Sequence, residues 1–141
     1  MLFQAEEVLR LIPQRAPIVM VDRLLDADGD MCHTGLSVSS KNYFIETDGK
    51  LAETGLIEHI AQSASAFAGY RYLLKNLPAP IGYIGEIKNF VCMERPAIGA
   101  ELTTEIVFEA EAEGITLMSG KTSCEGRPIA STRMKIFVEP A

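Results

Sequence analysis

The run TGLIEHIAQSASAFAGYRYLLK, from Thr54 to Lys75, is the strongest indication of the fold in this sequence. Small residues dominate its middle, namely Ala61, Ser63, Ala64, Ser65, Ala66, Ala68 and Gly69. Apolar side chains recur with the spacing of a helix, at Ile57, Ile60, Ala61, Ala64, Phe67 and Ala68. Because so few charges interrupt the run, we expect one long helix that the rest of the chain encloses on most sides.

The segments before this helix carry the signals of a short helix and two strands. Ala5–Ile12 is expected to form a short helix that Pro13 ends. Residues 18–27 and 31–39 are expected to be strands, joined by a turn at Asp28-Gly29-Asp30.

The segments after the helix alternate in polarity, which is typical of strands. Turns are expected at Glu113-Gly114 and Glu125-Gly126, within a meander of four strands. One face of one of these strands is expected to carry Leu102, Thr104, Ile106 and Phe108, and one face of the last to carry Ala130, Thr132, Met134, Ile136 and Val138, with Met118 and Thr122 in the strand between them. The chain, residues 1–141, is therefore predicted to be one α+β domain in which a curved antiparallel sheet wraps around the central helix.

Composition excludes several classes of function. The formal net charge of −6 argues against nucleic-acid binding, which needs an excess of Lys and Arg. No apolar run approaches the ~20 residues of a membrane span, and no basic-then-apolar leader opens the chain, so the cytoplasm is the expected location. The odd set Cys32, Cys92 and Cys124 favours small buried side chains over disulfides or zinc. No metal or nucleotide motif occurs, so no cofactor is expected.

Four residues of the central run form a stripe of polar or small side chains. Glu58, Gln62, Ser65 and Gly69 are spaced i, i+4, i+7 and i+11 on an otherwise apolar helix. A carboxyl group in such a place is a candidate general acid. Alternatively, Glu58 pairs with the positive end of the helix dipole, and Gln62 is a buried amide that binds backbone.

Three segments together resemble the β-hydroxyacyl-(acyl-carrier-protein) dehydratases, a family with the hotdog fold. LIPQRAPIVMVDR at 11–23 is similar to the N-terminal segment "LPHRYPFLLVDR" of that family. LIEHIAQ at 56–62 resembles "LxxExxAQ" of the central helix. GEIKNFVCMERPAIGAEL at 85–102 resembles the strand and turn "KFRRPVxPGDxL". The matching order and spacing cover nearly the whole chain.

The resemblance implies a hotdog fold and the dehydration of 3-hydroxyacyl thioesters in fatty-acid or polyene-type biosynthesis. The substrate would be carried by an acyl-carrier protein or coenzyme A. Glu58 would protonate the departing hydroxyl, with Gln62 one turn later, in a site shared between the protomers of a dimer. Glu58 is then expected to border an apolar tunnel, with the N–H of Gly55 available to the developing enolate.

The sequence departs from the family at the catalytic histidine. The family has it about fourteen residues before the glutamate, where this chain has Phe44, and the loop 43–55 contains neither His nor Pro. The family also has a glycine five residues before its glutamate, whereas here Gly55 lies three residues before Glu58. We therefore predict that the usual base is missing.

Two histidines and two loop carboxylates remain as substitutes for that base. His33 has the parity of the outer face of its strand, so we expect it to point away from the core. His59 lies about 100° around the helix from Glu58. It either reaches across a dimer seam or is a hydrogen-bonded structural residue. Glu46 and Asp48 are either replacement bases or solvated loop charges.

Three functions stay open at this point. The first is a dehydratase, acting as a homodimer or as a heterodimer with a paralogue that supplies the histidine. The second is a hotdog thioesterase that uses Glu58. The third is a non-catalytic subunit that binds acyl thioesters. Four cations, Arg71, Lys75, Lys88 and Arg95, are either a docking patch for an acidic carrier protein or ordinary solubilising charges.

Overall fold

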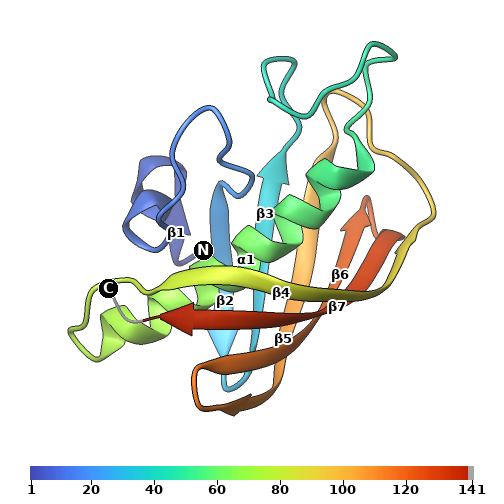
Figure 1. The fold of residues 1–141 in the computed structure, drawn as a ribbon. Helices are drawn as coiled ribbons and strands as arrows, with labels where there is room; N and C mark the ends of the chain where they lie inside the picture. Colours follow the sequence, from blue (N-terminus) through green and yellow to red (C-terminus); the bar gives the residue numbers. More distant parts are fainter. Residues whose placement is uncertain (140–141) are drawn as a thin grey trace.

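The computed structural model describes residues 1–139, which form one sheet and one long helix (Figure 1). In chain order the elements are β1 (Phe3–Gln4), the 3-10 helix η1 (Ala5–Arg10), β2 (Arg23–Asp28), β3 (Met31–Ser37), α1 (Glu53–Leu74), β4 (Ile81–Cys92), β5 (Glu101–Ala112), β6 (Ile115–Cys124) and β7 (Arg127–Glu139). None of the helices in this range combines the length and apolar character that a bilayer crossing needs.

The sheet has seven strands in the order β1-β2-β3-β5-β6-β7-β4, and every neighbouring pair is antiparallel. It curves around α1, as Figure 1 shows. The two predicted turns after the helix are confirmed as two-residue hairpins. Glu113-Gly114 and Glu125-Gly126 all have positive φ, between 51° and 80°. That backbone matches the right-handed twist of the strands that each turn joins. The predicted curved antiparallel sheet around a central helix is confirmed.

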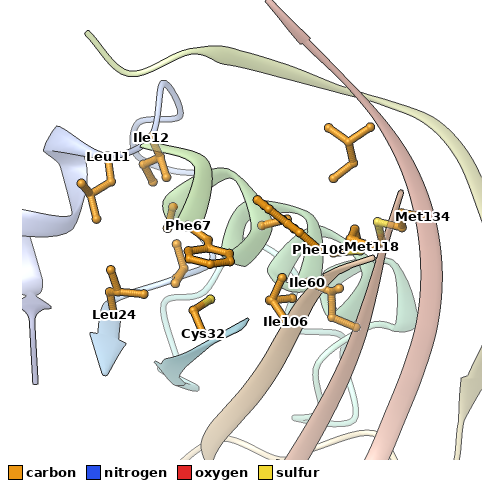
Figure 2. Close-up of a cluster of buried hydrophobic side chains, with 14 of the residues drawn as sticks. Leu11, Ile12, Leu24, Cys32, Ile60, Phe67, Ile106, Phe108, Met118 and Met134 are labelled. Atoms are coloured by element: carbon orange, nitrogen blue, oxygen red, sulfur yellow. The ribbon is translucent and has the colours of Figure 1, made fainter. Parts of the chain in front are cut away.

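The core forms where α1 contacts the inner face of the sheet (Figure 2). Phe67 of α1 and Phe108 of β5 pack with their ring centroids 4.7 Å apart, beside Ile60, Ile106 and Met118. Small residues let the chain approach α1 closely. A Cβ atom on Gly69 would lie 1.9 Å from the carbonyl oxygen of Leu11, so only glycine fits there.

The expected strand over residues 18–27 was wrong in its first half, since β2 begins only at Arg23. The backbone groups of Ile18 and Met20 bind side chains of α1 instead of a neighbouring strand. Two further boundaries also differ from the expectation. The short helix is a 3-10 helix that ends at Arg10, and β3 ends at Ser37.

The three cysteines are free thiols, as predicted. Cys32 and Cys124 are buried, whereas Cys92, near the end of the edge strand, is only half-buried.

Strand β4 is an edge of the sheet and carries exposed apolar side chains. Within residues 1–139 it pairs with β7 alone. Its exposed apolar side chains are Ile81, Tyr83, Ile84, Ile87 and Val91. A long apolar edge strand of this kind is a template for pairing with another chain.

Candidate active site

A groove runs along α1 and has Glu58 in its lining. We call it the α1 groove. Its volume is about 290 Å³, and it lies between α1, the start of β4 and the end of β7. The other lining residues are mostly apolar or small: Gln14, Ala61, Ala64, Ser65, Ala68, Gly82, Tyr83, Ile84, Phe108, Thr116, Ile136 and Val138. A carboxyl group beside an apolar groove suits a substrate that combines a polar reacting end with an alkyl chain.

Gln62 holds the Glu58 carboxylate and a neighbouring backbone segment at once. Its Nε2 donates hydrogen bonds to Oε2 of Glu58, at 2.9 Å, and to the carbonyl of Ile18, at 2.7 Å. Its Oε1 accepts from the backbone N–H of Met20 at 2.6 Å. The amide is fully buried and bonded on both sides, so it cannot rotate without breaking these contacts. Gln62 therefore fixes the direction of the carboxylate.

The predicted stripe on α1 divides between two environments. Glu58 and Ser65 line the α1 groove together with Ala61 and Ala68. Gln62 and Gly69 instead contact the segment before β2, through Ile18, Met20 and Leu11. The split follows from the helical repeat of 3.6 residues. Around the helix axis, Gln62 and Gly69 are rotated to one side of the direction in which Glu58 points, and Ser65 is rotated to the other side.

Phe44, which the sequence spacing places where the family's histidine is expected, packs at the start of α1. A Cβ atom on Gly55 would lie 2.7 Å from the Cβ atom of Phe44, so glycine allows this contact. The N–H of Gly55 donates to the carbonyl of Ala52 at 2.9 Å. In this structure the predicted enolate donor is therefore engaged within the first turn of the helix.

His59 is fully buried, and both of its ring nitrogens are hydrogen-bonded. Nδ1 donates to the Met20 carbonyl at 2.6 Å, since a carbonyl oxygen can only accept. Nε2 then accepts from the hydroxyl of Thr104 at 2.7 Å, and Thr104 contacts Thr122 at the same distance. His59 and Gln62 thus bind both backbone groups of Met20. This arrangement favours the structural interpretation of His59 over a base that reaches across a dimer seam.

Burial lowers the pKa of His59 to about 4, a shift that the nearby Arg23 increases and that the hydrogen bond to Met20 opposes. Between pH 6.5 and about 4 the unfolded chain therefore binds a proton that the folded chain does not. The free energy of unfolding should fall as the pH drops through this window, by up to about 3 kcal/mol. Urea denaturation at pH 7 and pH 4.5 measures the change. In the His59→Gln variant this part of the pH dependence should vanish; an equal loss in both proteins would contradict the account.

The other candidate bases lie away from the α1 groove. Arg95 binds Asp48 at 2.7 Å and Glu46 at 2.7 Å. The Arg95 hydrogen bond lowers the pKa of Asp48, which makes its carboxylate a weaker base. His33 points to the outer face of the sheet, as predicted, where its Nδ1 lies 2.9 Å from Asp26.

Sequence reasoning missed part of the groove lining. Gln14 belongs to the segment that resembles the dehydratases, yet nothing in that pattern indicated that it lies near Glu58. Tyr83 and Ile84 were not predicted to line it either. Ile136 and Val138 were predicted to share one face of the last strand, and that alternation was the available signal for the wall opposite α1.

Three of the four cations proposed for carrier-protein docking are already paired within the chain. Arg71 contacts Glu111 at 3.2 Å, Lys88 contacts Glu86 at 3.1 Å, and Arg95 contacts the two loop carboxylates. Lys75 is exposed just after α1. These ion pairs weaken the predicted docking patch. Within residues 1–139, no group of three or more His, Cys, Asp or Glu side chains is arranged to hold a metal ion.

Solved structures with the same fold define the class of protein. A chain of the dehydratase heterocomplex ApeI:P from Xenorhabdus doucetiae superposes with a TM-score of 0.88 at 21% identity, covering 95% of this chain and 91% of that chain. A hypothetical thioesterase from Streptococcus pneumoniae TIGR4, solved with coenzyme A, gives 0.64 at 12% identity, covering 84% and 85%. The fold is the hotdog fold.

Sequence comparison then gives the family. The model of the ApeP-like family, described as ApeP dehydratase, matches residues 6–141. This chain belongs to the ApeP-like dehydratase family. It is also 28% identical over 137 residues to the 3-hydroxyacyl-[acyl-carrier-protein] dehydratase FabZ of Escherichia coli O9:H4 (strain HS), covering 93% of this chain and 89% of the relative. The predicted resemblance to hotdog dehydratases is confirmed.

Proposed function

We propose that this chain is the glutamate-bearing subunit of a two-subunit, cytoplasmic 3-hydroxyacyl-thioester dehydratase. One observation carries the proposal. Glu58 lines the α1 groove, whereas His59 is buried with both ring nitrogens bonded and His33 lies on the outer face of the sheet. The chain has no third histidine. We therefore assign the base for the reaction to a partner subunit.

The chemistry divides naturally between an acid and a base. The partner's histidine would remove a proton from the carbon next to the thioester carbonyl. Glu58 would give its proton to the hydroxyl on the third carbon, which leaves as water, so that the products are an enoyl thioester and water. Gln62 acts as a positioning residue, because its Nε2 holds Oε2 of Glu58 while its Oε1 is anchored to Met20.

The names of similar proteins support this assignment. FabZ is a 3-hydroxyacyl-[acyl-carrier-protein] dehydratase, which supports the reaction and a carrier-bound substrate. The ApeI:P structure is a dehydratase heterocomplex, which supports pairing of this chain with a paralogue. The thioesterase that binds coenzyme A supports a pantetheine thioester as the handle of the substrate.

The exposed edge of β4 is the surface that we assign to the partner. Pairing there would continue the sheet across two subunits and cover the apolar side chains of the strand. Gly82, Tyr83 and Ile84 belong both to this strand and to the lining of the α1 groove. A partner on β4 would therefore lie directly beside the groove, where a residue of its own can reach the substrate.

The pairing is tested by mixing the chain with a histidine-bearing hotdog paralogue from the same genome and measuring the dissociation constant by sedimentation. Ile87→Asp puts a charge on the β4 edge, at a side chain that is 41% exposed. We expect it to weaken the complex about 30-fold, as the loss of ~2 kcal/mol at an interface implies.

Leu117→Asp is the matched control, because Leu117 is 39% exposed but lies on β6, two strands away from the edge. This variant should bind the paralogue like the unchanged chain. Equal weakening by both substitutions, or no complex with the unchanged chain, would contradict pairing through β4.

A further inference from the structure

The α1 groove continues beyond Ala68 into a second hollow at the other end of the helix. This second hollow has a volume of about 460 Å³ and includes Arg71, Tyr72 and the turn between β5 and β6 in its lining. Four residues line both hollows, namely Ala68, Phe108, Thr116 and Val138. The two hollows therefore adjoin and form one depression that follows α1.

Arg71 marks the change from an apolar to a charged lining. Its Nη2 lies 3.2 Å from Oε2 of Glu111 on β5, and its Nη1 lies 3.9 Å from Oδ1 of Asp30. The guanidinium carbon is 5.6 Å from the ring centroids of both Phe67 and Phe108. The two rings, which are tilted by 38° to each other, and the two carboxylates hold the cation between the helix and the sheet. The cation therefore lies next to Phe108, which lines both hollows.

An alkyl chain that starts near Glu58 meets these charges after a defined length. At 1.5 Å per residue, Ala68 lies about 15 Å and Arg71 about 20 Å along the helix from Glu58. Up to Ala68 the lining that α1 and the strands provide is mostly apolar. Beyond it, an alkyl chain would have to displace water from the ion pair of Arg71 and Glu111, which is unfavourable.

We propose that the ion pair between Arg71 and Glu111 sets the longest acyl chain that the α1 groove accepts. This inference rests on the proposed function, because it assumes that the groove takes the alkyl part of a thioester. Arg71 is then a specificity-determining residue that acts at the far end of the chain. It takes no part in proton transfer.

The test uses S-alkyl pantetheine thioethers, which cannot react, in a series that grows by two carbons at a time. Their dissociation constants are measured by calorimetry on the complex of this chain with its paralogue. Each methylene that enters an apolar site should tighten binding about fourfold. In the unchanged protein the gain should stop at the length that reaches Arg71. In Arg71→Ala and Arg71→Met the gain in affinity should continue for at least one further addition of two carbons, which tightens binding about tenfold or more.

Arg133→Ala is the matched control, because Arg133 forms a similar pair with Glu109, at 3.0 Å, on the outer face of the sheet. In Arg133→Ala, the thioether length at which affinity stops rising should be the same as in the unchanged protein. The length limit is found by comparing ligands of different length on one and the same variant. A general loss of stability in that variant therefore does not change the limit. An unchanged limit in both Arg71 variants would overturn the proposal and leave the proposed function standing. If no thioether binds the unchanged complex, the thioester-binding function fails as well.

Discussion

Glu58→Gln is expected to slow dehydration by the complex of this chain with its paralogue about 10²–10⁴-fold, the usual contribution of a positioned acid or base. The substituted amide is close in shape to the carboxyl group and can still accept the hydrogen bond from Gln62. It cannot give a proton to the departing hydroxyl. The rate is followed by the absorbance of the enoyl thioester, with the substrate at saturating concentration.

Ser65→Ala is the control for Glu58→Gln. Ser65 lines the same groove but lies on the other side of the Glu58 direction from Gln62. It should retain most of the rate. Both variants should bind non-reacting thioethers like the unchanged protein, so that only the chemical step is affected in Glu58→Gln. A Glu58→Gln complex that keeps its rate within about tenfold would exclude Glu58 as the general acid.

The central helix and the hairpins could be predicted because their signals are local. The helix expected from Thr54 to Lys75 is observed from Glu53 to Leu74. Its small residues pack against the enclosing chain as expected, and Gly69 lies against the backbone of Leu11. The Glu-Gly turns need positive φ at two successive residues, and this need is readable directly from the sequence.

The first half of the strand expected at 18–27 could not be excluded from the sequence. Ile18-Val19-Met20-Val21 is apolar, and three of its four residues are β-branched, which favours a strand locally. In the fold, Gln62 and His59 bind the backbone of Ile18 and Met20 from about 40 residues further along the chain. Such long-range hydrogen bonds between side chains and backbone leave no periodic pattern in the sequence.

The candidate site was partly predictable. Spacing on the helix identified Glu58 and brought Gln62 within reach of it, since residues four apart on a helix are neighbours. The spacing could not show that Gln62 turns toward the 18–20 segment while Ser65 turns toward the groove. The spacing on the helix also could not show which residues form the wall of the groove opposite α1. Tyr83, Ile136 and Val138 reach the groove through the pairing of β4 with β7.

The isolated chain is expected to dehydrate 3-hydroxyacyl thioesters about 10²–10⁴-fold more slowly than its complex with the histidine-bearing paralogue. A missing general base raises the barrier by about 3–5 kcal/mol. Phe44 has no group that can accept a proton, and the carboxylates of Glu46 and Asp48 are bound to Arg95. Among the residues that the structure describes, the groove lining contains no His, Lys or Cys and no carboxylate other than Glu58, and Tyr83 is its one other titratable side chain.

The most direct measurement follows enoyl absorbance and free thiol together, for this chain alone, the paralogue alone and the mixture. We predict that the mixture forms enoyl thioester faster than either protein alone, without release of thiol, and that Glu58→Gln in this chain removes the gain. Thiol release by the chain alone, lost on Glu58→Gln, would identify a thioesterase instead. Dehydration by the chain alone at the rate of the mixture would contradict the claim that its base comes from a partner.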